Sequence, residues 1–299
     1  SRGLGDVYKR QSLNSLADKD LLGKTIPKGR RGRLSGWAAG ISGLMTMGIG
    51  IWFAVRDRST DNPVFYALLL AAAGSTWLVA TVLFSTVKET PGETAGGANG
   101  WKEAWSRLDL MRTDSAFRRF VIARALLLCS ALTSPFYVVL AREHGEGGAS
   151  LLGTFLVAGG LASSLSAPVW GTMADKSSRQ VLTLAALLTA GLGGALFAVM
   201  RLAPDLAGAV WLFPVFFFAL GVVHAGVRAG RKTYLVDLAG GVKRTDYVAV
   251  SNTLIGILLL VVGGVTSLFA HYPAENVILG LSSFGLLGAV LARTLPEVQ

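Results

Sequence analysis

Acidic residues, histidine and cysteine are all scarce in this chain. Of 299 residues, 18 are Asp or Glu, three are His, and one, Cys129, is Cys. A single cysteine excludes a disulfide within the chain and a cysteine-based metal cluster. The histidines His144, His224 and His271 are far apart in sequence, and the chain has no phosphate-cradling loop of the Gly-x-x-x-x-Gly-Lys-Ser/Thr type. We therefore expect neither an enzyme nor a bound metal or cofactor.

Charged residues are also few, at 15%, whereas 52% of the residues are hydrophobic, a balance that excludes an ordinary soluble domain. Apolar stretches of about 18 residues or more recur, and each can cross about 30 Å of hydrocarbon as a helix. They are too long and unbroken for a membrane β-barrel. We predict an all-α integral membrane protein, a polytopic bundle with about eight transmembrane helices. The predicted spans are 36–55, 63–87, 120–141, 149–171, 180–200, 208–227, 248–270 and 276–292.

The distribution of charge supports these spans. All 18 Asp and Glu residues fall outside them, and Arg124 is the one Lys or Arg inside. The loops predicted on one side carry most of the basic residues, while the other side has only Arg56, Arg58, Arg142 and Arg201. The positive-inside rule then places both termini in the cytoplasm. The net charge of +10 is thereby explained as a topological signal, with no need for a nucleic-acid partner.

The predicted spans divide the chain into regions. A basic cytoplasmic segment covers 12–35, two transmembrane helices cover 36–87, and a cytoplasmic linker covers 88–119. Trp101, Trp105, Leu108 and Leu110 in the linker could form an interfacial amphipathic helix or belong to a solvated loop. Six helices follow in 120–299. Glycines such as Gly32, Gly36 and Gly40, four residues apart, favour close helix packing.

The most informative motif joins the fourth and fifth spans. Gly171, Asp175, Lys176 and Arg179 form the pattern Gly-x-x-x-Asp-Lys-x-x-Arg in a tight cytoplasmic loop. Glycine permits close helix packing, and the aspartate can accept hydrogen bonds from amides at the positive end of a neighbouring helix. Lys176 or Arg179 could pair with this aspartate or with lipid phosphates. The alternative is a simple basic turn with a helix-capping Asp.

This loop resembles the signature loop of the major facilitator superfamily, a family of membrane transporters. Ser178 and Gln180 depart from the usual pattern. The resemblance implies that 120–299 is the complete C-terminal six-helix half of a twelve-helix transporter and that 36–87 is the last two helices of its N-terminal half. The first four helices would then be missing, and residues 1–11 resemble read-through of a sequencing adapter. The family's pseudo-symmetry implies that the partner of Asp175 is the N-terminal end of the first span, near Arg33, Ser35 and Gly36.

The resemblance also implies which helices line a solute cavity, namely the third, fourth, sixth and seventh spans. Arg124 is either functional or snorkels to headgroups. Hydroxyl groups on the third span either face solute or bond their own helix. No span contains a carboxylate, so proton coupling would fall to His224, to the missing helices, or to no ion. The candidate substrate or coupling residues are Arg124, Ser130, Thr133, Ser134, Tyr137, His224, Arg228 and Asn252.

The sequence thus favours a secondary active transporter that moves a small organic solute by alternating access. The solute could travel with a proton or another ion, and the basic candidates favour an anion. The expected location is a bacterial cytoplasmic membrane, the full-length protein is expected to be a monomer, and the lipid bilayer is the other partner. The alternative is a non-transporting membrane receptor or assembly factor on the same fold.

Overall fold

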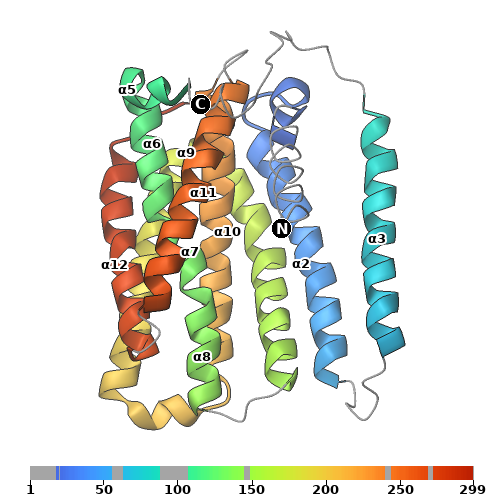
Figure 1. Cartoon of the computed structure of the whole chain (residues 1–299), viewed down its shortest axis with the longest axis vertical. Coiled ribbons are helices and arrows are strands. Elements are labelled where there is room, and N and C mark those ends of the chain that lie inside the picture. Colours follow the sequence, from blue (N-terminus) through green and yellow to red (C-terminus); the bar gives the residue numbers. More distant parts are fainter. Residues whose placement is uncertain are drawn as a thin grey trace.

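A computed structural model describes residues 18–19, 21–55, 63–87, 107–144, 149–239, 244–268 and 272–298. Within these ranges the elements are helices, and the long ones run up and down along roughly one direction (Figure 1). Six of the described helical segments are long and apolar enough to cross a membrane. The structure therefore confirms a multi-pass, all-α membrane protein. Trp101 and Trp105 of the predicted linker lie outside the described residues.

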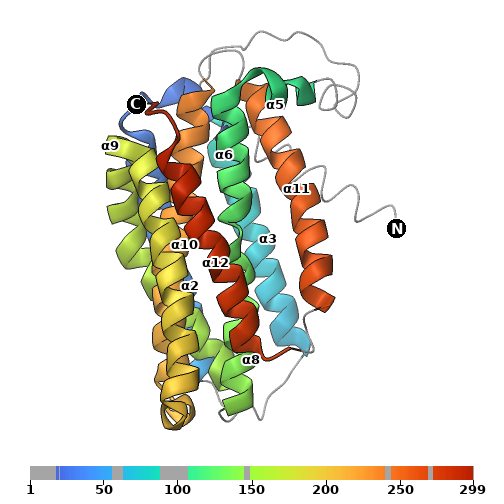
Figure 2. The same ribbon diagram turned by 90° about the vertical axis from the view of Figure 1, so that its left-hand side faces the viewer.

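The longest helical element, α9 (Ala149–Leu202), is two helices joined at a sharp turn. A straight helix of 54 residues would be roughly 80 Å long, more than twice the thickness of the hydrocarbon core. The backbone leaves helical geometry at Ser177, with φ −162° and ψ 98°. The two parts then run in opposite directions along the bundle (Figure 2). The predicted spans 149–171 and 180–200 lie one on each side of this turn.

The predicted span 120–141 is a discontinuous helix. It consists of α6 (Ser115–Leu126), α7 (Cys129–Leu132) and α8 (Ser134–His144), which together form one membrane-length segment. Asp114 begins α6 by accepting hydrogen bonds from the amides of Ala116 and Phe117, both 2.9 Å long. Pro135 follows the second interruption, where it has no amide hydrogen to continue the helical bonding.

The remaining long helices are α10 (Leu212–Leu238), α11 (Arg244–Leu268) and α12 (Ala274–Arg293). Helix α10 continues to Leu238, beyond the C-terminal end of the predicted span 208–227. Charged residues interrupt its hydropathy after Val227, yet Thr233, Tyr234 and Val236 are buried. Asp237 is therefore inside α10, next to its last residue, and is 4% exposed.

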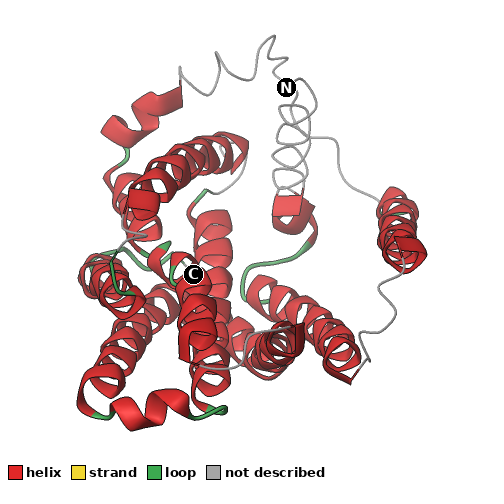
Figure 3. Cartoon of the chain, turned by 60° about the horizontal axis from the view of Figure 1, so that its bottom comes forward, coloured by secondary structure: helices red, strands yellow, loops and turns green. Residues whose placement is uncertain are grey.

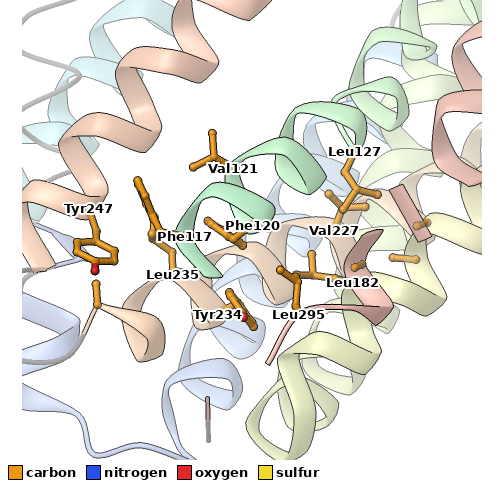
Figure 4. Close-up of a cluster of buried hydrophobic side chains, with 14 of the residues drawn as sticks. Phe117, Phe120, Val121, Leu127, Leu182, Val227, Tyr234, Leu235, Tyr247 and Leu295 are labelled. Atoms are coloured by element: carbon orange, nitrogen blue, oxygen red, sulfur yellow. The ribbon is translucent and has the colours of Figure 1, made fainter. Parts of the chain in front are cut away.

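The largest apolar core lies at the end of the bundle where α5 (Leu110–Thr113) and the C terminus are found (Figures 1 and 4). Phe120 stacks on Tyr234 at 5.0 Å between ring centroids, and Phe117 packs on Tyr247 at 4.6 Å. Leu108 and Leu110 of the predicted linker pack against this core. We call this end of the bundle the tail end, because Leu295 of the C-terminal tail is buried in it.

Helices α2 (Arg31–Val55) and α3 (Pro63–Ser85) are joined to this bundle differently. Helix α2 packs antiparallel along the first part of α9, with Gly36 against Ala167 and Gly43 against Gly160. Helix α3 stands apart from the other helices (Figures 1 and 3). The predicted spans 36–55 and 63–87 correspond to these two helices.

Candidate functional site

The turn in α9 is joined to the start of α2 by Asp175. Its Oδ1 atom accepts a hydrogen bond from the Gly32 amide at 2.6 Å, and its Oδ2 atom accepts one from the Arg33 amide at 2.8 Å. These amides belong to the first turn of α2, where backbone N–H groups have no partner within the helix and the helix dipole is positive. We call this arrangement the clasp.

Small residues make the clasp possible. Gly171 lies directly against Gly32, so that a Cβ atom added at Gly171 would collide with the Gly32 carbonyl oxygen. Gly36 is buried against Ala167 and Gly171. Of the residues predicted near Asp175, Arg33 contributes its amide and Gly36 its lack of a side chain. Ser35 instead lines a cavity described below.

The two basic residues of the loop do not pair with Asp175. Arg179 Nε lies 3.2 Å from Glu297 Oε2, and Arg179 also bonds the Leu295 carbonyl at 3.3 Å. Ser177, at the turn, donates to the same Glu297 carboxylate at 3.0 Å and accepts from the Gln180 amide at 3.2 Å, as a helix N-cap does. Lys176 is exposed and pairs with no described acidic residue. The loop therefore holds α2 through Asp175 and the C-terminal tail through Arg179.

A buried ion pair lies beside the clasp. Arg31, the first residue of α2, contacts Asp237 of α10 with Nη1 2.5 Å from Oδ1, and their side chains are 6% and 1% exposed. Arg31 also donates to the carbonyls of Ile26 and Gly23, at 2.9 and 2.8 Å. The guanidinium thus joins the segment before α2, α2 itself and α10. Sequence reasoning missed this pair because Asp237 was placed in a loop.

A basic cavity of about 360 Å³ lies between α2, α6, α9, α10 and α11. Among the predicted site residues, Arg124, Arg228 and Asn252 line it. Arg124 donates to Ser251 Oγ at 2.6 Å and to Asn252 Oδ1 at 3.1 Å, so its guanidinium points into the bundle rather than toward headgroups. The other cationic side chains in its lining are Lys19, Arg231 and Lys232.

A second cavity, of about 410 Å³, adjoins the first, because Arg228 and Ala39 line both. We call it the hydroxyl cavity. Ser130 and Ser134, from the interrupted part of the third span, face it together with His224, whose Nδ1 lies 3.1 Å from Ser130 Oγ. The paired glycines Gly159 and Gly160 also line it, within unbroken helix. The other hydroxyl residues in its lining are Ser42, Thr46 and Ser163.

Two predicted site residues line neither cavity. Thr133 is 1% exposed and bonds the Ser130 carbonyl at 3.4 Å, which is the local bonding that a buried threonine commonly makes. Tyr137 is also 1% exposed and belongs to an apolar cluster with Leu140 and Phe155. The structure therefore gives both side chains packing roles.

Sequence reasoning missed Arg231 and Lys19 as cavity residues. His224, Arg228 and Arg231 are spaced i, i+4 and i+7, which places them on one face of a helix. That pattern would have indicated Arg231 if α10 had been predicted to continue past 227. Lys19 is in the segment before α2 and reaches Asn252 Oδ1 at 3.5 Å, a contact that no local pattern indicates.

Comparison of the sequence with protein-family models and with curated proteins finds no match. The class of the protein consequently rests on its helices and cavities: it is a multi-pass helical membrane protein with polar cavities inside the bundle.

Proposed function

We propose that this protein is a secondary active transporter of the major facilitator type, moving a small organic solute across a bacterial cytoplasmic membrane by alternating access. In this proposal the two parts of α9 count as separate passes, α3 is a pass, and the chain crosses the membrane eight times with both termini in the cytoplasm. The six passes from α6 to α12 act as one body, and α2 belongs to the opposing body.

The observation that carries the proposal is the clasp between Asp175 and the amides of Gly32 and Arg33. It spans the contact between α2 and the first part of α9, and both cavities adjoin this contact. Charge-assisted hydrogen bonds contribute about 1.5–3 kcal/mol, enough to bias two conformations without locking either. A clasp at one end of a helix pair that borders a polar cavity is what a gate requires.

Glycine packing beneath the clasp supports the same proposal. Backbones in contact along α2 and α9 can slide or separate without repacking large side chains, as packed helices do in hinge and shear motions. The buried pair of Arg31 and Asp237 lies beside the clasp and connects α2 with α10. Opening at the tail end would have to break both the clasp and the ion pair, or move the joined segments together.

The test is the accessibility of one cysteine from each side of the membrane. The buried Cys129 is replaced by alanine, Ser42→Cys is introduced in the hydroxyl cavity, and the protein is reconstituted in vesicles. A membrane-impermeant maleimide is then applied from either face. Alternating access predicts labelling from both faces. It also predicts that Asp175→Asn, which loses the second charge-assisted bond, raises labelling from the tail end several-fold.

The matched control is Asp205→Asn, which removes an exposed carboxylate outside the clasp and should leave labelling unchanged. Labelling from one face alone, unaffected by Asp175→Asn, would contradict alternating access and favour a static receptor.

A further inference from the structure

The basic cavity has an excess of positive charge. Among the described residues, Lys19, Arg124, Arg228, Arg231 and Lys232 line it, and its lining contains no Asp or Glu. Lys232 is compensated, because its Nζ lies 2.9 Å from Asp18 Oδ2. Arg228 and Arg231 pair with no described acidic residue. A cavity of this kind attracts an anion, since its cations otherwise repel one another at short range.

Arg124 adds a second, independent observation. The guanidinium donates hydrogen bonds to Ser251 and Asn252, which are both neutral. Its Nε atom is buried and has no hydrogen-bond partner among the described residues. A buried donor without an acceptor costs roughly 1–3 kcal/mol, more when it is charged. An acceptor oxygen from a bound anion would satisfy this group, because guanidinium favours carboxylate and phosphate oxygens.

The charges converge on one place. Burial, together with the positive charges of Arg124, Arg231 and Lys232, lowers the pKa of Lys19 to about 8, while Asp18 opposes this shift. These side chains come from the segment before α2, from α6 and from α10, so three separate elements bring cations together. A bound anion would relieve this repulsion and raise the pKa of Lys19 again.

The hydroxyl cavity has a different chemistry. Its described lining includes Ser42, Thr46, Ser130, Ser134 and Ser163 and no carboxylate, and Phe217 supplies an apolar surface. Several of these hydroxyls donate to backbone carbonyls, as Ser163 does to Ala39 at 3.1 Å and Thr46 to Ser42 at 2.9 Å. A hydroxyl that has used its donor still has acceptor lone pairs. Such a cavity can accept hydrogen bonds from the hydroxyl groups of a solute.

We infer that the two cavities together form one binding site for a hydroxylated phosphate monoester, with the phosphate in the basic cavity and the hydroxylated body in the hydroxyl cavity. A phosphate monoester carries about −1.5 to −2 charges at pH 7 on one group, whereas a carboxylate carries one. Arg228 lines both cavities and would lie at the junction between phosphate and body. The inference deepens the proposed transport function. That the ligand is a transported substrate rests on that function, whereas binding itself does not require transport.

The test compares four probes by calorimetry on the purified chain in phosphatidylcholine nanodiscs: glucose 6-phosphate, glucuronate, glucose and inorganic phosphate. We expect glucose 6-phosphate to bind at least ten-fold more tightly than glucuronate or inorganic phosphate, and glucose not to bind measurably. If glucuronate bound as tightly as glucose 6-phosphate, the site would not prefer a dianion, and that part of the inference would be overturned. If inorganic phosphate bound as tightly, the hydroxyl cavity would contribute nothing to binding. Failure of all four probes to bind would overturn the inference as a whole.

A lipid headgroup is the other source of a phosphate monoester. The same titration in nanodiscs that contain phosphatidic acid separates the two sources. If the soluble phosphate monoester is the ligand, saturating glucose 6-phosphate still binds with the same stoichiometry. Loss of that binding in phosphatidic acid nanodiscs would assign the site to a lipid headgroup and overturn the inference of a solute.

Variants locate the site. Arg231→Gln should weaken glucose 6-phosphate binding at least ten-fold, and Ser134→Ala should weaken it several-fold while leaving inorganic phosphate unchanged. The control Arg112→Gln removes an exposed cation of α5 outside both cavities and should change neither. Thermal unfolding of each variant shows whether it folds. A folded Arg231→Gln protein with unchanged affinity would place the phosphate elsewhere.

The dependence of binding on pH tests independently whether Lys19 belongs to the site. The Lys19 ammonium loses its proton as pH rises through about 8, so the cavity loses one charge between pH 7 and 9 and binding should weaken. Phosphate monoesters are already dianionic above about pH 6, and arginine stays protonated, so neither produces this loss. Lys19→Gln should flatten the profile, and a steep profile that persists in this variant would exclude Lys19 from the site.

The outcomes for binding and for transport remain distinguishable. If glucose 6-phosphate binds but Ser42→Cys is labelled from one face alone, the binding site is supported and alternating access is contradicted. Two-sided labelling without binding of any phosphate monoester would keep the transporter and overturn this substrate class.

Discussion

Helices α2 and α3 are neighbours in the sequence and are both strongly apolar, yet α2 packs by one face along α9 and α3 stands apart from the other helices (Figures 1 and 3). In α2 the buried positions include five glycines, Gly32, Gly36, Gly40, Gly43 and Gly50. In α3 the side chains of Leu68, Leu70, Trp77 and Leu78 are each more than 60% exposed. Helix α3 has one glycine, Gly74, and no atom of the described residues lies within 4 Å of where its Cβ would be.

The difference shows that apolarity and association are separate properties in a membrane helix. Lipid tails are as apolar as leucine, so burying leucine against another helix gains little there. Close packing of small residues and a few polar contacts supply the preference for a partner. Helix α2 has both, namely the glycine face against α9 and the two polar connections at its N-terminal end, the clasp and the pair of Arg31 with Asp237.

Breaking the buried ion pair should have the largest effect on α2. Arg31→Gln leaves the Asp237 carboxylate buried without its cation and removes bonds to the Ile26 and Gly23 carbonyls. Loss of one partner of a buried pair costs about 3–5 kcal/mol. Reversible unfolding in mixed detergent micelles measures the change in the free energy of unfolding.

The control for this variant is Arg33→Gln, because the Arg33 side chain is exposed and its contribution to the clasp is a backbone amide. The double variant Arg31→Met with Asp237→Leu should recover most of the loss, since an apolar pair needs no compensation of charge. A cost below about 1 kcal/mol for Arg31→Gln would mean that water reaches the pair and that it does not hold α2.

The glycine face should come next. In Gly36→Leu the new Cβ would collide with the Ala167 carbonyl oxygen, so α2 and α9 must move apart. Overpacking of this kind costs about 1–3 kcal/mol. Gly48→Leu, on the same helix with no described residue within 4 Å of its Cβ position, is the matched control and should cost nothing. Equal unfolding free energies for the two variants would remove the glycine face as the reason for docking.

Much of this architecture could be predicted from the sequence. Long apolar stretches identified the helices, and glycines four residues apart on α2 predicted its packing face. The motif from Gly171 to Arg179 predicted a turn that would hold another helix terminus. These features are local, because hydropathy and spacing within one segment decide them.

The features that escaped prediction are long-range. Asp237 was placed outside a helix because hydropathy falls where Arg228, Arg231 and Lys232 begin, although the helix continues there and these cations line a cavity inside the bundle. Arg31 and Asp237 pair across 206 residues, and Lys19 reaches Asn252 across 233. A charge that ends a predicted span in one segment is tolerated when a distant segment supplies its partner, and one sequence does not display that pairing.

The smallest effect is expected in α3, where the same substitution used on α2 meets no neighbour. Gly74→Leu places a side chain in open space and replaces a poor helix former, so the free energy of unfolding should stay within about 0.5 kcal/mol or rise slightly. The same detergent unfolding measures it beside Gly36→Leu. A cost for Gly74→Leu equal to that for Gly36→Leu would show that α3 is closely packed in the membrane against a further helix. The two helices would then differ in which helix they pack against, and not in how closely they pack.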